Sequence, residues 1–162
     1  MKASSNGKKL LAAWEGLVTH PYQDSGDAWT IGVGHLLTDK ELQSGTIKIG
    51  SRLISIHGMT ESLCFDLLEQ DLAKAERTIN QSVKVSLSQN QFDALASFVF
   101  NVGIQAFSDS TLLRLLNQGK YNEVPTQLRR WNKDNGKVNK GLTNRRRKEI
   151  ALWNTLDDTV AV

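Results

Sequence analysis

Residues 14–35 read WEGLVTHPYQDSGDAWTIGVGH, and they carry two acidic side chains and a hydroxyl at a defined spacing. Asp24 follows Glu15 by nine residues, and Thr30 follows Asp24 by six. The residues before this stretch repeat apolar side chains at helical intervals, and a serine at position 4 or 5 is available as the N-cap. The pattern therefore predicts a short helix that ends near Glu15.

A hairpin is predicted directly after this helix. Gly16 breaks the helix, and residues 22–24 and 29–33 are typical of two short strands. Residues 25–28, Ser-Gly-Asp-Ala, supply the backbone conformations that a hairpin turn needs. Asp24 is then expected where the first strand enters the turn, and Thr30 just after the chain returns. A helix end and a hairpin thus bring together three side chains that are distant in sequence.

Two carboxylates and a hydroxyl meet the chemical needs of glycosidic-bond cleavage by water. One carboxyl group protonates the leaving oxygen, while the second activates or replaces the attacking water on the opposite face of the sugar. Each residue also has a purely structural interpretation: Glu15 as a helix-end charge, Asp24 as a turn former and Thr30 as a strand residue. The sequence context favours the chemical interpretation for all three.

The remainder of the chain is predicted to be mostly helical. Further helices are expected at about 60–80, 89–100, 110–118, 123–131 and 143–156. Ser88 and Gln91 have the spacing of a capping box at the start of the second of these helices. Residues 46–49 and 53–56 could form extra strands, but the sequence assigns no role to the segment 41–57.

These elements predict an α+β fold in one domain that covers residues 1–162. A small lobe with a hairpin or short sheet is expected at about 13–59, followed by a linking helix at about 60–80. A larger helical lobe is expected at about 81–162, together with the N-terminal helix. A cleft between two lobes is a natural ligand site.

Composition excludes several classes of site and structure. Cys64 is the single cysteine, so no internal disulfide can form, and it is expected to be a small buried side chain. The three histidines, His20, His35 and His57, lack the spacing of a zinc site, and no metal is expected. Neither a signal peptide nor a membrane-spanning run is predicted. The net charge of +3 and a pI near 9.1 favour an anionic partner.

The chain resembles the phage-type lysozymes, or endolysins, of glycoside hydrolase family 24. The resemblance is carried by the Glu…Asp…Thr spacing, by the run Thr30-Ile31-Gly32-Val33-Gly34-His35 and by Phe100-Asn101-Val102-Gly103. It continues in Trp131 with the preceding Arg129-Arg130, and in the segment 141–147, Gly-Leu-Thr-Asn-Arg-Arg-Arg. The resemblance covers nearly the whole chain and implies a lysozyme-like fold.

The resemblance also implies a role for each candidate site residue. Glu15 would be the general acid, and Asp24 with Thr30 would position and activate the water in an inverting reaction. Leu36, Phe100 and Ser110 correspond to family positions that border the saccharide. His35 would support the site through a structural ion pair or hydrogen bond, and Arg145 resembles a family arginine that approaches the catalytic acid.

The implied activity is hydrolysis of the β-1,4 bond between N-acetylmuramic acid and N-acetylglucosamine in peptidoglycan, which lyses the bacterial host. The implied partner is the glycan strand; the enzyme would be a monomer without cofactor, nucleic acid or stable membrane association. It would stay in the host cytoplasm until another phage protein permeabilises the membrane. A lytic transglycosylase and a non-catalytic wall-binding module are the alternatives.

The densest basic region is the run at residues 145–148, with Arg129 and Arg130 upstream. Nucleic-acid binding is one interpretation of such a cluster. No recognition-helix pattern or stacking motif accompanies the charge, so attraction to a polyanionic cell wall is favoured.

Overall fold

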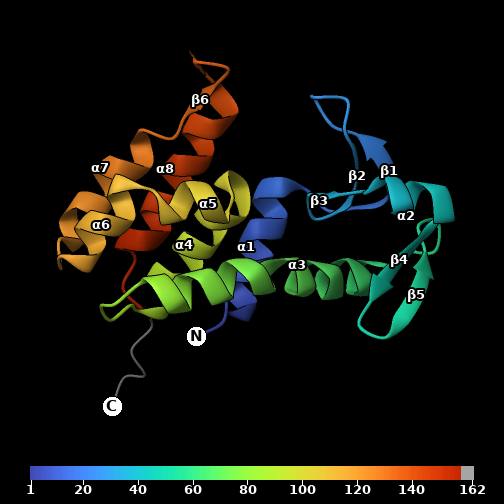
Figure 1. The fold of residues 1–162 in the computed structure, drawn as a ribbon, viewed down its shortest axis with the longest axis horizontal. Coiled ribbons are helices and arrows are strands. Elements are labelled where there is room, and N and C mark those ends of the chain that lie inside the picture. Colours follow the sequence, from blue (N-terminus) through green and yellow to red (C-terminus); the bar gives the residue numbers. More distant parts are fainter. Residues whose placement is uncertain (158–162) are drawn as a thin grey trace. The chain divides into compact units, whose positions relative to one another are not determined.

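The computed structural model describes residues 1–157, and their contacts divide the chain into two compact units (Figure 1). One unit is Lys8–Ala73, and the other joins Met1–Gly7 to the chain from Lys74 onward. Helices α1 (Ser5–Glu15) and α3 (Glu61–Ser82) both run across the division. The predicted α+β class is confirmed, because helices dominate and the strands form small antiparallel sheets.

The division differs in position from the lobes expected at about 13–59 and 81–162. It falls inside α1 and inside α3, and α3 contributes to both units instead of only linking them. The last five residues of the expected helical lobe, 158–162, lie outside the described residues.

α1 has clear start and stop signals in its sequence. The Ser4 hydroxyl accepts a hydrogen bond from the backbone N–H of Gly7 at 2.9 Å, which caps the first turn. At the other end, Gly16 has a φ of +85°, a conformation that favours glycine, and its N–H donates to the Ala12 carbonyl at 2.8 Å. Glu15 is therefore the last residue of the helix, as predicted.

A three-stranded antiparallel sheet follows, in the order β1 (Val18–Gln23), β2 (Trp29–Gly32) and β3 (His35–Leu36). Tyr22 pairs with Thr30, and Thr30 pairs with Leu36, so these residues form one row across the sheet. Residues directly opposite each other on antiparallel strands share a face of the sheet. The predicted hairpin is confirmed, although β1 begins earlier than expected because Val18 pairs with Gly32 across an irregular register.

The segment that follows contains a helix and a second hairpin. α2 (Asp39–Ser44) begins with a reciprocal capping box of Thr38 and Glu41 and ends at Gly45, whose φ is 70°. β4 (Thr46–Ile49) and β5 (Arg52–Ser55) pair antiparallel, which confirms the two extra strands. The sequence analysis missed α2, because six residues are too few to show an apolar helical period.

The core of the unit Lys8–Ala73 is formed by apolar side chains from the strands, their connections and α3. Its buried members are Ile31, Leu37, Ile47, Ile49, Ile56, Met59, Cys64 and Leu67. Cys64 is fully buried, as the sequence predicts. Burial, and next the charge of Glu61, raises the pKa of the Cys64 thiol. The sheet that carries Thr30 is thus anchored to α3 by a continuous apolar cluster.

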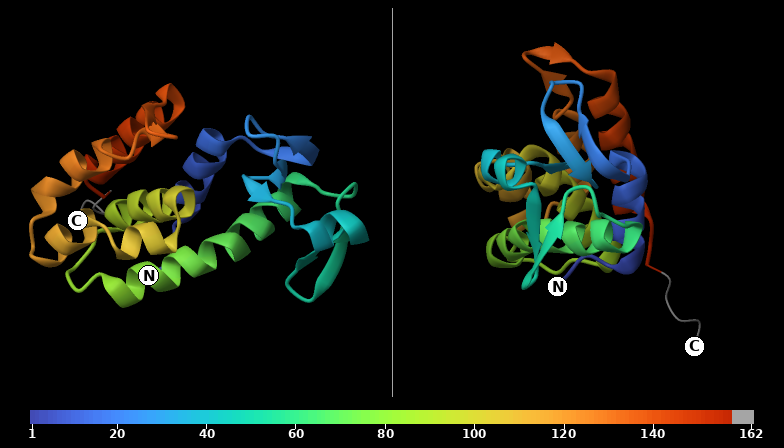
Figure 2. Two further views of the ribbon diagram at one scale, coloured as in Figure 1. Left: turned by 45° about the horizontal axis from the view of Figure 1, so that its top comes forward. Right: turned by 90° about the vertical axis from the view of Figure 1, so that its right-hand side faces the viewer.

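The other unit is built from packed helices and a short hairpin (Figure 2). Its elements beyond α3 are α4 (Gln89–Val102), α5 (Ile104–Ser108), α6 (Thr111–Asn117), the 3-10 helix η1 (Tyr121–Glu123), α7 (Val124–Arg129), β6 (Lys133–Asp134), β7 (Lys137–Val138) and α8 (Lys140–Asn154). α4 packs against α8, and α8 also contacts α7. The predicted capping box of Ser88 and Gln91 starts α4.

Three features of this unit differ from the sequence-based expectation. α8 begins three residues earlier than predicted, because the Asn139 side chain accepts a hydrogen bond from the Leu142 N–H at 2.9 Å. The hairpin β6–β7 lies between two predicted helices, where no strand is predicted, and Asn135 and Gly136 make its turn with φ values of 50° and 77°. α5 is an additional short helix after Gly103. Among residues 1–157, no helix is long and apolar enough to cross a membrane.

Candidate active site

Glu15, Asp24 and Thr30 all belong to the unit Lys8–Ala73. Glu15 ends α1, Asp24 follows β1 directly, and Thr30 is the second residue of β2. The two acidic residues are half-buried, whereas Thr30 is buried, with 3% of its surface exposed. Each side chain therefore stands at an element boundary or inside a strand, where the backbone is well fixed.

Asp24 organises the hairpin turn with one of its two carboxylate oxygens. Oδ1 accepts hydrogen bonds from the N–H groups of Gly26 and Ala28, both at 2.9 Å. The Asp24 N–H donates to the Ala28 carbonyl at 2.9 Å, and the Asp27 N–H donates to the Asp24 carbonyl at 3.0 Å. The second oxygen, Oδ2, has no hydrogen-bond partner among residues 1–157. The turn therefore fixes the carboxylate and leaves one oxygen available as an acceptor.

Thr30 is tied to the same turn. Its hydroxyl donates a hydrogen bond to the Ala28 carbonyl at 3.0 Å. Ala28 thus contacts Asp24 through its N–H and Thr30 through its carbonyl. Because the hydroxyl proton points at Ala28, the lone pairs of Oγ1 are available to accept a hydrogen bond from another group.

Tyr22 is a polar residue of this site that the sequence analysis missed. It lies opposite Thr30 in the sheet and two residues before Asp24 on β1. Burial raises the pKa of the Tyr22 phenol above its usual value of 10, and the charges of Glu15 and Asp24 raise it further. The phenol therefore lies in the electrostatic field of both carboxylates. The two-residue period of a strand could have identified Tyr22, because it lies two residues before Asp24 and alternate residues of a strand share one face.

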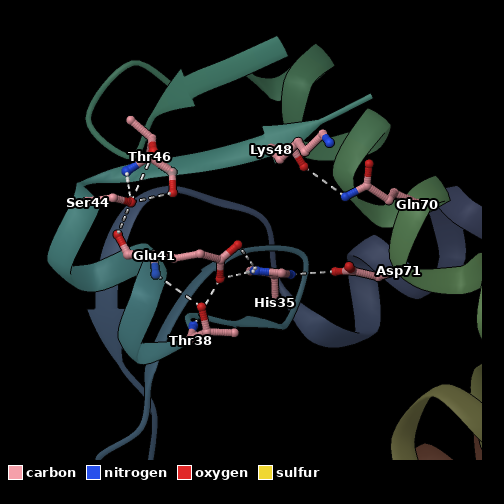
Figure 3. Close-up of polar contacts among 8 residues, drawn as sticks. All are labelled: His35, Thr38, Glu41, Ser44, Thr46, Lys48, Gln70 and Asp71. Atoms are coloured by element: carbon pink, nitrogen blue, oxygen red, sulfur yellow. Dashed lines mark hydrogen bonds and ion pairs between the residues drawn. The ribbon is translucent and has the colours of Figure 1, made fainter. Parts of the chain in front are cut away.

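His35 lies between two carboxylates in the same unit (Figure 3). Its Nδ1 is 2.8 Å from Asp71 Oδ2, and its Nε2 is 3.0 Å from Glu41 Oε1. Burial disfavours the charged ring, but the hydrogen bonds and charges of Asp71 and then Glu41 outweigh it and raise the pKa of His35 from 6.5 to about 9. The imidazolium consequently joins β3 to α2 and α3, which steadies the sheet that carries Thr30.

The three predicted substrate contacts have different surroundings. Leu36 pairs with Thr30 and is 60% exposed, so an apolar side chain stands in solvent beside the buried hydroxyl. Phe100 is half-buried in α4. Ser110 is the N-cap of α6: its hydroxyl accepts from the Leu113 N–H at 3.1 Å and donates to the Phe107 carbonyl at 2.7 Å. A contact between these residues and a saccharide stays a prediction.

Arg145 belongs to a buried polar cluster of the helical unit. Its Nε donates to Glu149 Oε2 at 3.4 Å, and its Nη2 donates to the Ser97 carbonyl at 3.2 Å. Ser97 Oγ also donates to Glu149 Oε2 at 2.6 Å. These contacts join α4 to α8, and the proposed approach of Arg145 to the catalytic acid stays a prediction. The described residues, 1–157, contain no group of three or more His, Cys, Asp or Glu that could hold a metal ion.

The fold is that of a lysozyme-type hydrolase: a mostly helical α+β chain with short antiparallel sheets. The chain belongs to the phage lysozyme family, whose model matches residues 12–149.

Individual relatives agree with this family. The endolysin of Bacillus phage PZA is 38% identical over 157 residues, which cover 96% of this chain but 56% of that protein, so the chain spans about half of that relative's length. The SAR-endolysin of Escherichia phage Mu is 37% identical over 147 residues, which cover 91% of this chain and 78% of that protein. A crystal structure of a P22 lysozyme mutant superposes with a TM-score of 0.79 at 37% identity, covering 96% of this chain and 99% of that one.

Proposed function

We propose that this chain is a phage endolysin that hydrolyses the β-1,4 bond between N-acetylmuramic acid and N-acetylglucosamine in peptidoglycan. Glu15 is the general acid, and Asp24 and Thr30 hold and activate the attacking water. The reaction inverts the anomeric configuration and needs no cofactor. The observation that carries this proposal is the different use of the two oxygens of Asp24, one in the turn and one available as an acceptor.

The turn gives Asp24 the rigidity that a water-activating carboxylate needs. Two backbone N–H groups hold Oδ1, so the carboxylate cannot rotate without breaking both hydrogen bonds. An acceptor that is already oriented needs little reorganisation when the reaction begins, and such preorganisation is a large source of catalytic rate. Oδ2 is then the oxygen that accepts a proton from the attacking water.

Thr30 completes the site for this water. Because its own proton is donated to the Ala28 carbonyl, Oγ1 meets a water molecule as an acceptor. A water that donates one hydrogen bond to Asp24 Oδ2 and another to Thr30 Oγ1 keeps its lone pairs for the anomeric carbon. The hydroxyl therefore orients the nucleophile, and the carboxylate takes its proton.

This use of Thr30 favours inversion over retention. A retaining enzyme brings its carboxyl groups to about 5–5.5 Å so that one of them attacks the sugar, whereas an inverting enzyme keeps them about 6.5–9.5 Å apart to admit a water. A hydroxyl that orients a water has a purpose only in the second case. We therefore place a water between Asp24 and the sugar.

Replacement of the acid provides the direct test of the activity. Glu15→Gln is expected to keep the fold and to slow turbidity clearance of permeabilised bacteria. The rate should fall by about a hundredfold to ten-thousandfold, which is the usual contribution of general acid catalysis. Glu69→Gln is the control, because it makes the same chemical change on an exposed side chain of the same unit. Equal clearance by a folded Glu15→Gln protein and by this control would refute the role of Glu15.

Product analysis separates the proposed hydrolase from its alternatives. Digestion of purified peptidoglycan in ¹⁸O-labelled water should place the label at the reducing end of the released muramic acid, first as the α anomer. Unlabelled anhydro-sugar would identify a lytic transglycosylase, and wall binding without any product would identify a binding module. An early β anomer would contradict inversion alone.

The proposed partner is the peptidoglycan glycan strand, which the enzyme meets as a monomer after another phage protein has opened the host membrane. Light scattering should give the mass of one chain, 18.0 kDa. Expression in the cytoplasm of a susceptible host should cause lysis only after a membrane-permeabilising agent is added. Lysis without that agent would contradict the proposed order of events.

A further inference from the structure

A pocket of about 240 Å³ lies within the helical unit between the end of α7 and one face of α8. Its lining residues are Arg129, Asn132, Thr143, Arg146, Arg147 and Ile150. The four from α8 follow the i, i+3, i+4, i+7 spacing of a single helical face. None of the six is a candidate catalytic residue.

The pocket is constructed around a buried guanidinium group. Arg146 is 1% exposed, its Nε lies 2.9 Å from Glu149 Oε1, and its Nη2 donates to Asn101 Oδ1. The guanidinium carbon also stands 5.0 Å above the ring of Phe98. Contacts on several sides hold this cation in one orientation, in contrast to a surface arginine that moves freely.

Arg129 and Arg147, the other two arginines of the pocket, carry positive charges that no nearby acidic side chain of the described chain neutralises. Arg129 and Arg147 are exposed, and neither has an acidic partner within 4 Å among residues 1–157. Asn132 donates to the Thr143 hydroxyl at 3.2 Å, which ties the chain after α7 to α8. The pocket therefore has a fixed polar wall and two cations that can close on a ligand.

The surrounding segment is far more basic than the rest of the chain. Residues 129–148 contain nine lysines and arginines and one acidic residue, Asp134, which gives them a net charge of +8. The whole chain carries +3, so the remaining residues together carry −5. The positive charge is therefore concentrated around this pocket, where it attracts anions from solution.

We propose that this pocket binds a phosphate ester group of the bacterial envelope. Guanidinium groups donate pairs of parallel hydrogen bonds to carboxylate and phosphate oxygens alike. A phosphodiester offers two outer oxygens and one charge, and a polymer that repeats this group can engage several arginines at once. The lysines nearby, Lys133, Lys137, Lys140 and Lys148, suit a ligand that repeats its phosphates. Only the bacterial source of the ligand rests on the proposed function.

Such a site would hold the enzyme on phosphate-bearing material beside its glycan substrate. Binding and hydrolysis are then separate measurements, because no pocket residue belongs to the proposed catalytic group. If the wild-type protein hydrolyses peptidoglycan but does not bind phosphate, the pocket proposal alone is refuted. If the wild-type protein binds phosphate but does not hydrolyse peptidoglycan, the proposed function alone is refuted.

The test compares two double variants that remove the same charge from the same segment. Arg129→Gln with Arg147→Gln removes the two exposed cations of the pocket, and Lys133→Gln with Lys137→Gln removes two cations from the hairpin β6–β7 outside it. Affinity for soluble poly(glycerol phosphate) is measured by calorimetry over a series of salt concentrations. The arginine variant should lose about tenfold or more in affinity, and the lysine variant should lose clearly less. Equal losses would show general charge attraction and overturn the proposal.

Further ligands identify the source of the phosphate. Inorganic phosphate should compete with the polymer, and vesicles of phosphatidylglycerol should bind only if lipid phosphates also enter the pocket. Stronger binding to either the polymer or these vesicles than to phosphatidylcholine vesicles, lost in the arginine variant, supports a phosphate site. Single-stranded DNA with the same number of phosphates should bind more weakly than the polymer. Equal or tighter binding of DNA would overturn the envelope assignment.

Discussion

Replacement of His35 by asparagine is expected to remove a pH-dependent part of the free energy of unfolding. The imidazole lies 2.8 Å from Asp71 and 3.0 Å from Glu41, and its pKa in the folded chain is about 9 instead of 6.5. A group whose pKa is higher in the folded than in the unfolded state stabilises the fold. The stabilisation is complete at pH values low enough for both states to be protonated. The stabilisation is therefore complete below about pH 6.5 and disappears as the pH rises towards 9.

The size of this effect follows from the same pKa. The difference between 6.5 and about 9 corresponds to about 3 kcal/mol as an upper limit. All three side chains retain some contact with solvent, with 15% of His35, 19% of Glu41 and 22% of Asp71 exposed, so screening reduces the expected value to about 2 kcal/mol. Burial disfavours the charged form of Glu41, but the Thr38 N–H and His35 outweigh it and lower the pKa of Glu41 below 4.5. The stabilisation that the Glu41 carboxylate contributes is lost as the pH falls through its lowered pKa.

Urea denaturation at intervals between pH 5 and pH 9.5 measures the effect. The difference between the wild-type protein and His35→Asn should be largest at about pH 5–6.5 and should decline towards pH 9. His57→Asn is the control, because this histidine is exposed and, within residues 1–157, its side chain makes no hydrogen bond and its backbone N–H donates to Ser55 Oγ. A loss of stability in His35→Asn that is the same at every pH would refute the ion-pair argument and indicate a packing effect.

Three other substitutions test the site and its framework. Asp24→Asn keeps an oxygen for the two turn N–H groups but cannot take a proton from water. The melting temperature should therefore stay unchanged while turnover falls about a hundredfold or more. A parallel loss of stability would contradict this separation of structure from catalysis. Tyr22→Phe removes a hydroxyl near two carboxylates, so the pH–activity profile should move to higher pH, and an unmoved profile would exclude the phenol from the site. Gly16→Ala places a side chain at a φ of +85° and should lower the free energy of unfolding by about 1 kcal/mol, measured by urea denaturation. Gly58→Ala, at a position without a positive φ, should lower it less. Equal losses would argue against strain at the end of α1.

Local signals explain most of what the sequence could predict. The start of α4 follows from the Ser88 and Gln91 capping box, and the end of α1 follows from Gly16. The hairpin that carries Asp24 was predictable because its turn residues lie between two short runs of strand-forming residues. These features depend on a few neighbouring residues, so no knowledge of the tertiary structure is needed to find them.

The features that were missed are either very short or depend on distant contacts. α2 has a readable capping box, Thr38 and Glu41, but no apolar period to accompany it. Asn135 and Gly136 form a recognised turn pair, yet the strands beside them have two residues each and show no alternation. The pairing of His35 with Asp71 joins residues that are 36 apart, and no local pattern can indicate it.

Complete burial of Cys64 determines how this residue responds to oxidants. A cysteine is oxidised mainly as its thiolate, and burial together with the charge of Glu61 raises the pKa of this thiol. Oxidation to a sulfenic acid and disulfide exchange with a second copy both need solvent access, which the surrounding apolar side chains deny. Peroxide or a change of redox environment therefore leaves this residue unmodified as long as the core around it stays folded, so Cys64 oxidation reports transient opening of that core.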